Sequence, residues 1–86
     1  MFQYRFKNLN VKCGGQDFLV SGVGYYVIED WEEDGKEAGF EKAEVYDALG
    51  KDGYVKSQEC LGYISESAVE TLNKDSYLCR LLGNKI

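Results

Sequence analysis

The stretch FLVSGVGYYVIE, residues 18–29, constrains the fold more than any other part of this sequence. It is rich in valine, isoleucine and tyrosine, which pack well on a pleated surface, so it predicts a strand. Two glycines inside it, Gly22 and Gly24, indicate a bend or a close approach of another backbone. The segment CGGQD just before it predicts a turn, so this strand follows an earlier one in a meander.

The first strand is predicted by the alternation of apolar and polar residues in FQYRF. Its apolar residues occupy even positions over 2–6 and odd positions over 9–13, so the alternation changes phase between the two segments. A bulge near Asn8 re-aims side chains in this way. We therefore predict one strand with a bulge.

The middle of the chain is read as a loop followed by two further strands. The segment 30–40 predicts a long polar loop. The segment EKAEVYDAL, 41–49, is compatible with a strand or a helix, and the strand is chosen because the turn-like GKDG follows it. The segment YVKSQECLGYI, 54–64, again has the aromatic and β-branched composition of a strand.

A C-terminal helix is predicted over residues 66–82. Ser67 and Glu70 match a capping box, with Ser65 as a rival cap. Gly83 is placed to end the helix in a left-handed conformation, and NKDS at 73–76 could divide it into two short helices. Three apolar residues are expected to pack this helix on the sheet: Val69, Leu72 and Cys79. The fold class is thus α+β, a small antiparallel sheet of about three to five strands with a C-terminal helix on one face, in a single domain, 1–86.

Composition limits the chemistry that the chain can perform. It has no histidine, so the commonest general base and the Ser–His and Cys–His nucleophile pairs are absent. No phosphate-binding glycine motif is present. The three cysteines are Cys13, Cys60 and Cys79, an odd and widely spaced set that favours reduced thiols over disulfides or a zinc site. We expect no catalysis and no cofactor.

The N-terminal segment MFQYRFKNLN lacks the apolar run of a signal peptide. No stretch approaches the roughly 20 apolar residues of a membrane span. The sequence therefore predicts a cytosolic protein with no membrane partner.

Acidity is concentrated in one segment. Residues 29–47 hold nine acidic and two basic side chains, a net charge of −7, whereas the whole chain carries −5. Such a patch repels nucleic acid and attracts basic surfaces or cations. Direct binding of nucleic acid is not expected, because phosphate neutralisation needs clustered Lys and Arg.

Within this segment, DWEEDGKEAGFE at 30–41 resembles a calcium loop in its spacing. Gly35 falls at the turn position, and the carboxylates of Asp30, Glu32, Asp34 and Glu41 fall at ligand positions. A β-rich segment precedes the loop where an EF-hand has a helix, and Glu37 stands where an apolar residue belongs. Calcium binding at 30–41 is therefore the weaker alternative.

We favour instead an acidic surface with an embedded aromatic residue. Tryptophan is enriched at interface hot spots, although Trp31 could also fold back over the edge of the sheet. The predicted partner-binding residues are Glu29, Asp30, Trp31, Glu32, Glu33, Asp34, Glu37, Glu41 and Glu44.

The segments 25–29, EKAEVYDALGKDG at 41–53 and ISESAVETL at 64–72 resemble parts of small hypothetical proteins encoded by bacteriophages and prophages. In size and charge the chain is also similar to inhibitors of bacterial defence, including anti-CRISPR proteins and DNA mimics. This resemblance implies a small binding protein in the host bacterial cytoplasm. It would inhibit a nucleic-acid-binding host protein by covering a basic surface with residues 29–47. The alternative is a phage structural or accessory protein whose acidic loop only keeps it soluble.

Overall fold

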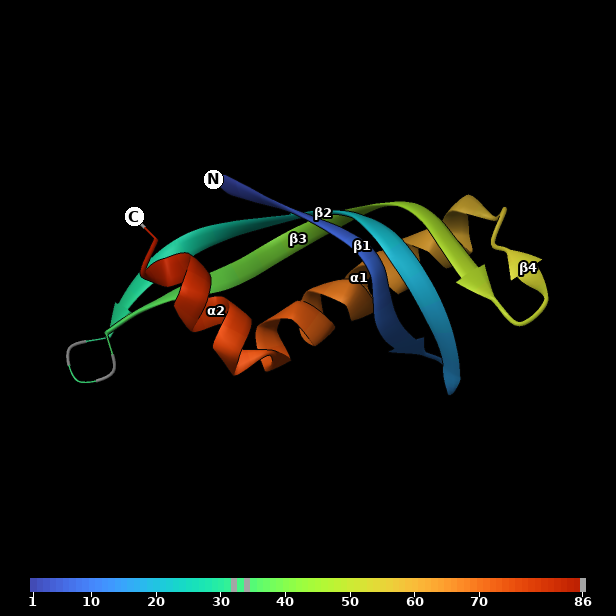
Figure 1. The fold of residues 1–86 in the computed structure, drawn as a ribbon. Coiled ribbons are helices and arrows are strands. Elements are labelled where there is room, and N and C mark those ends of the chain that lie inside the picture. The colour runs from blue at the N-terminus through green and yellow to red at the C-terminus, as the bar shows by residue number, and fades with distance from the viewer. Residues whose placement is uncertain (32, 34, 86) are drawn as a thin grey trace.

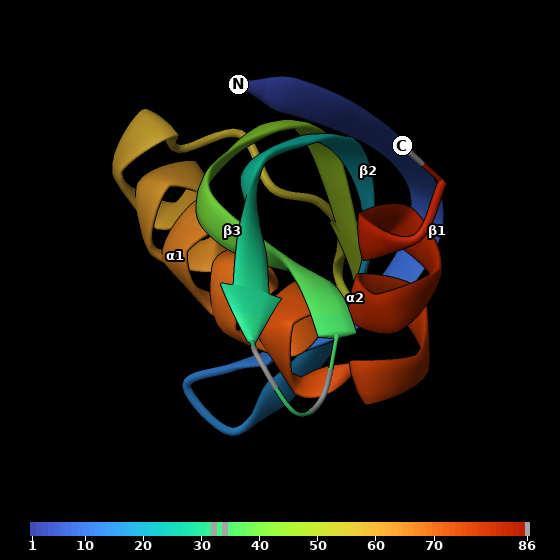
Figure 2. The ribbon, with the colours of Figure 1, turned by 90° about the vertical axis from the view of Figure 1, so that its left-hand side faces the viewer.

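The computed structural model describes residues 1–31, 33 and 35–85 and consists of a curled sheet with two C-terminal helices (Figure 1). Neighbouring strands are antiparallel in the order β1-β2-β3-β4. Both helices lie on the concave side of the sheet (Figures 1 and 2). The predicted α+β class, with a helix on one face of an antiparallel sheet, is confirmed. The elements are β1 (Phe2–Cys13), β2 (Gln16–Trp31), β3 (Gly35–Gly50), β4 (Gly53–Tyr54), α1 (Gln58–Lys74) and α2 (Ser76–Gly83).

The bulge predicted near Asn8 is present in β1. The register between β1 and β2 shifts between Phe6 and Leu9, and Asn8 has a φ of 56°. Asparagine tolerates this left-handed region better than most residues. The backbone N–H of Asn8 donates to Ser21 Oγ at 3.2 Å, which satisfies a donor at the irregular step of the ladder.

The two glycines of β2 lie where the chain packs too closely for a side chain. A Cβ at Gly22 would overlap the carbonyl oxygen of Glu44 on β3. A Cβ at Gly24 would lie 2.9 Å from Leu72 Cδ1 and 2.9 Å from the ring of Phe40. The predicted close approach is therefore confirmed, and at Gly24 it includes Leu72 of α1.

The prediction of a long loop over 30–40 is wrong. Strand β2 continues to Trp31 and β3 begins at Gly35, which has a φ of 83°. The two strands pair along almost their whole length, from Leu19↔Leu49 to Trp31↔Gly35. Polar composition does not prevent this pairing, because backbone hydrogen bonds hold the ladder and the outer part of the hairpin can expose its side chains.

The strand expected at 54–64 and the helix start expected at 66 are also wrong. Only Gly53–Tyr54 is strand, and α1 begins at Gln58. Ser57 is the N-cap, with its side chain accepting a hydrogen bond from Cys60 N at 3.3 Å. A capping serine therefore starts the helix about three turns before Ser67, the cap that the capping-box pattern indicated.

Tertiary packing explains why these β-forming residues are helical. Ile64, Ala68 and Leu72 are buried and lie on one face of α1, directed at the sheet. Helical spacing lets all three contact the core, which a short strand could not do. Ser65, the rival cap, lies inside the helix and donates to Leu61 O at 2.8 Å.

The helical region is divided at Asp75, as the NKDS segment allowed. Asp75 ends α1 and caps α2, with its carboxylate accepting from Leu78 N at 3.1 Å. The left-handed cap predicted at Gly83 is wrong, because Gly83 belongs to α2 and the C-cap is Asn84 with a φ of −94°. Gly83 instead lies against the carbonyl of Lys36, where a Cβ has no room.

The core lies between the concave face of the sheet and the two helices. Leu72 and Cys79 are buried and Val69 is half-buried, so the predicted contacts of the helical region are confirmed. The core has the following buried members: Phe6, Val11, Val20, Tyr26, Ala38, Phe40, Ala48, Ile64, Ala68, Leu72, Cys79 and Leu82.

Candidate functional site

The predicted acidic residues lie on the β2–β3 hairpin, whose outer end projects beyond α1 (Figures 1 and 2). Asp30, Trp31 and Glu33 are exposed there, and Trp31 retains 50% of its accessible surface. Trp31 is thus neither fully buried against the sheet nor fully extended into solvent. Glu32 and Asp34, which belong to the predicted site, lie outside the described residues.

The ladder separates the carboxylates of the hairpin onto its two faces. Glu29 is paired with Glu37, and Trp31 is paired with Gly35. Because every second residue of a strand faces the same way, the side chains of Glu29, Trp31 and Glu37 lie on one face of the hairpin. Asp30 is paired with Lys36 and faces the other way. The hairpin end therefore presents an acidic and aromatic face on one side and a pair of opposite charges on the other.

The pairing of Glu29 with Glu37 is electrostatically unfavourable, because like charges directly opposite each other destabilise a sheet. Arg80 of α2 compensates, donating from Nε to Glu37 Oε1 at 3.3 Å. The carboxylate of Glu29 lies over Gly39, where a Cβ would collide with it. Helix α2 thus pairs Glu37 with a cation, whereas Glu29 stays exposed. Sequence reasoning missed Arg80, which lies 43 positions from its partner.

Glu44 lies away from the hairpin end, on the part of the sheet near β1. It is paired with Val23 and lies near Tyr25, whose ring is 4.9 Å from Lys42 Nζ. Desolvation, followed by the charge of Glu44, raises the pKa of Tyr25. Glu37 and Glu44 are seven residues apart along β3, about 23 Å in an extended strand. The predicted residues therefore do not form one patch.

The pairing of β2 with β3 keeps apart two residues that a calcium loop would bring to one ion, Asp30 and Glu41. Asp30 is opposite Lys36, and Glu41 lies five residues further along β3, at the register shift beside Tyr26. Five residues of strand span about 16 Å, whereas an EF-hand brings both loop ends to one ion. Within the described part of the chain, no three His, Cys, Asp or Glu side chains are grouped to hold a metal.

Two exposed apolar side chains of α2 lie at the same end of the molecule as the β2–β3 hairpin (Figure 1). Tyr77 and Leu81 are four residues apart, so they share one helical face, and they are 78% and 44% exposed. With Arg80 and Asn84 they line a shallow cavity of about 430 Å³. Helix α2 buries Cys79, Leu82 and Gly83 and packs Leu78 partly against the core, so sequence periodicity alone did not single out Tyr77 and Leu81 as exposed.

The hairpin end thus combines half-exposed tryptophan, exposed carboxylates and an uncovered helical face. None of the described helices is long and apolar enough to cross a membrane. Comparisons of the chain with protein-family models, curated proteins and solved structures found no match.

Proposed function

We propose that this chain is a non-catalytic binding protein that uses the outer end of its β2–β3 hairpin to occupy a basic surface on a partner protein. The observation that carries this proposal is Trp31, half-exposed on the same face of the hairpin as the exposed carboxylate of Glu29, with Asp30 and Glu33 also exposed at the hairpin end. An aromatic anchor surrounded by charge suits a partner with an apolar pocket inside a basic surface.

The acidic segment and the resemblance to small phage-encoded proteins suggest the type of partner. We place it among nucleic-acid-binding defence proteins in the cytoplasm of a bacterial host. The carboxylates would then compete with nucleic acid for a basic groove. Only the acidic residues near the hairpin end can serve this role together, because Glu44 lies near Tyr25 on another part of the sheet.

A pull-down from bacterial lysate, followed by kinetics with the purified partner, tests the proposal. Wild type is compared with Asp30→Asn/Glu33→Gln, with Trp31→Ala, and with the control Asp17→Asn/Glu70→Gln, which changes charge equally at other exposed sites. Measurements at about 0.1 M and about 1 M salt shorten the screening length from about 10 Å to about 3 Å.

We expect Asp30→Asn/Glu33→Gln to slow association at low salt and Trp31→Ala to speed dissociation by about thirtyfold, the effect of a hot-spot anchor. Added nucleic acid should displace the protein from its partner. Equal kinetics for wild type, both hairpin variants and the control would contradict the proposal. That outcome would favour a phage accessory protein whose acidic hairpin only aids solubility.

A further inference from the structure

The two edges of the sheet differ in what covers them. On the outer side of β3, β4 pairs with the end of the strand, the side chain of Asn73 bonds to the backbone of Phe40, and Gly83 lies against the carbonyl of Lys36. Strand β1 forms the other edge, because it is the first strand in the sheet order and pairs only with β2. The outward N–H and C=O groups of an edge strand are a template for a further strand.

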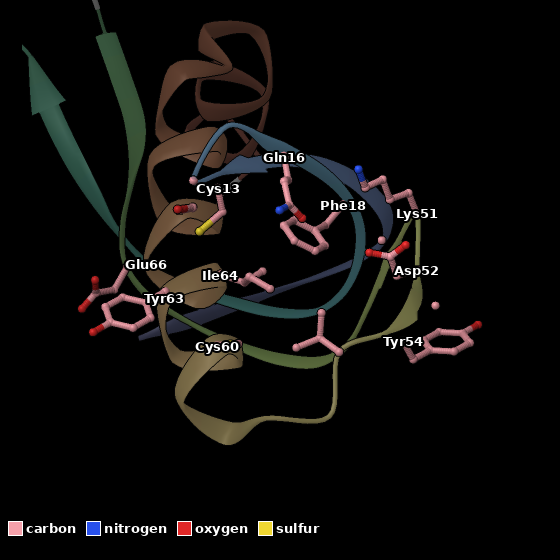
Figure 3. Close-up of a pocket in the computed structure, with 15 residues that line it drawn as sticks. Cys13, Gln16, Phe18, Lys51, Asp52, Tyr54, Cys60, Tyr63, Ile64 and Glu66 are labelled. Atoms are coloured by element: carbon pink, nitrogen blue, oxygen red, sulfur yellow. The ribbon is translucent and has the colours of Figure 1, made fainter.

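The open part of this edge is the first half of β1, Phe2–Lys7. Figures 1 and 2 show that this half starts on the side of the sheet away from α1. Within the described residues, its backbone pairs with β2 alone. The second half follows the bulge at Asn8 and leads toward α1, where Cys13 and Ile64 line a cavity of about 750 Å³ at the end of the molecule opposite the hairpin end (Figure 3). A regular incoming strand is therefore offered the six residues before the bulge.

The core side of this half is aromatic and holds the strand in place. Phe6 is buried, and Tyr4 is half-buried and packs against the core. The ring of Phe2 stacks on Tyr26 with centroids 5.5 Å apart, yet Phe2 remains 44% exposed. The edge is thus anchored before a partner arrives and still presents aromatic surface to one.

The opposite face of this half is basic. Arg5 and Lys7 are two residues apart, both are exposed, and neither forms an ion pair with a described residue. On the same face, Glu44 is separated from Arg5 by Val23, a distance of about 10 Å across two strand spacings. Because β1 contains no acidic residue, a second copy of this edge would bring like charges together. Its charge instead complements an acidic strand.

We propose that the edge Phe2–Lys7 binds an extended acidic peptide segment of a partner protein, which adds a fifth strand to the sheet. Backbone hydrogen bonds would supply affinity, and two carboxylates opposite Arg5 and Lys7 would supply specificity. The residues that alternate with the carboxylates would be apolar, because they face the aromatic side of the edge. The site is independent of the function proposed for the hairpin end, since β1 begins opposite Tyr26, five residues before Trp31.

Two peptides that differ only in charge test the proposal: acetyl-Thr-Val-Glu-Val-Glu-Val-Thr-amide and its twin with lysine in place of both glutamates. Each is titrated into the full-length ¹⁵N-labelled protein at about 0.1 M salt, and amide chemical shifts report affinity and location. We expect the acidic peptide to bind at least about fivefold more tightly, with the largest shifts in Phe2–Lys7. Equal affinities, shifts centred on other residues, or no saturation by the acidic peptide would overturn the proposal.

Backbone methylation distinguishes strand pairing from simple charge attraction. Residues two apart in a strand direct their N–H groups to the same edge. One isomer of the acidic peptide is therefore N-methylated at both glutamates, and the other at two of the valines. One isomer should lose binding and the other should keep it, because only one set of N–H groups faces β1. Equal binding of the two isomers would contradict the addition of a strand.

Matched variants test the basic face. Arg5→Gln/Lys7→Gln should remove the preference for the acidic peptide over its lysine twin. The control Lys51→Gln/Lys56→Gln removes the same charge at exposed positions outside β1 and should keep the preference. Equal preferences in the two variants would overturn the charge complementarity on which the proposal rests.

Sedimentation equilibrium of the free protein tests a second copy of the chain as the occupant. We expect Arg5→Gln/Lys7→Gln to leave the mass of the free protein unchanged. Dimerisation that appears or strengthens in this variant, with protection of Phe2–Lys7 amides from hydrogen exchange, would assign the edge to a second copy and reject the acidic peptide.

Discussion

The side-chain amide of Asn73 at the end of α1 forms two hydrogen bonds with the backbone of Phe40 on β3. Phe40 N donates to Asn73 Oδ1 at 2.8 Å, and Asn73 Nδ2 donates to Phe40 O at 3.0 Å. The amide imitates a neighbouring strand at an edge where β3 has none, since β4 pairs only with Leu49 and Gly50. It satisfies two backbone groups and fixes the helix to the strand.

Replacing Asn73 with Ala should therefore lower the free energy of unfolding by about 1–3 kcal/mol, because two backbone groups lose their partners. Urea unfolding followed by circular dichroism measures this loss. Asn84→Ala is the matched control, since its amide bonds only to Arg80 O at the exposed end of α2. A loss at Asn73 no larger than the loss at Asn84 would show that water replaces the amide at the strand edge.

Leu72 and Gly24 should be energetically coupled. Leu72→Ala should cost about 2–5 kcal/mol by leaving a cavity in the core. Gly24→Ala should cost about 1–3 kcal/mol, because the new methyl group collides with Leu72 Cδ1 and the Phe40 ring. The double variant should lose less than the sum, since the shorter side chain at position 72 admits part of that methyl group.

The control for this coupling combines Gly24→Ala with Leu82→Ala. Leu82 is buried in α2, and the nearest neighbours of a Cβ at Gly24 are Leu72 and Phe40 instead. The losses in the free energy of unfolding caused by Gly24→Ala and Leu82→Ala should therefore add. Additivity for the Leu72 pair as well would mean that the Phe40 ring alone resists the methyl group.

The pKa of Tyr25 should depend on Glu44. Desolvation is the largest cause that raises this pKa, and the charge of Glu44 raises it further. Glu44→Gln should therefore lower it toward the ordinary value near 10, as observed by NMR of ¹³C-labelled tyrosine. Glu70→Gln, an exposed change on α1, is the control and should leave it unaltered.

The raised pKa of Tyr25 also predicts how the stability of the protein changes with pH. Because the pKa of Tyr25 is higher in the folded state than in the unfolded state, its contribution is complete below about pH 10 and is lost as pH rises through the folded pKa. Wild type should thus lose stability above pH 10 more steeply than Glu44→Gln. Parallel losses in the two proteins would remove Glu44 as a cause of the shift.

Cys60 and Cys79 should differ strongly in reactivity toward a thiol reagent such as DTNB. Cys60 is exposed, whereas Cys79 is 4% exposed and its thiol donates to Leu72 O at 3.4 Å. Burial, followed by the charges of Glu37, Asp75 and Glu29, raises the pKa of Cys79 and disfavours its reactive thiolate.

We therefore expect Cys60→Ser to remove the fast phase of labelling in the native protein and Cys79→Ser to leave it intact. The Cys79 thiol should react only when denaturant opens the core. Labelling of Cys79 at the rate of Cys60 without denaturant would show that α2 separates readily from β3.

The sequence by itself determined those features that depend on local chemistry. The β-forming run at 18–29, the bulge near Asn8, and the tight packing at Gly22 and Gly24 all follow from the shape and freedom of individual residues. The division of the helical region at Asp75 belongs with them, because a capping carboxylate acts within one turn. The concentration of acidity over 29–47 is likewise a property of the composition.

Tertiary structure alone decided the features that depend on partners distant in the sequence. Residues 54–64 have a strand-like composition, yet most of them are helical because Ile64 contacts the core only from a helix. Residues 30–40 look like a loop, but pairing with a long neighbouring strand extends the ladder to Trp31. Local propensities amount to less than about 1 kcal/mol per residue, and such packing and pairing override them.

The candidate sites show the same division. The sequence identified the carboxylates but not their separation onto two faces, because that depends on the register of the strands. It contained Arg80 and Asn73 without indicating that they meet Glu37 and Phe40, 43 and 33 residues away. The cavity opposite the hairpin end is lined by segments that only the folded chain brings together.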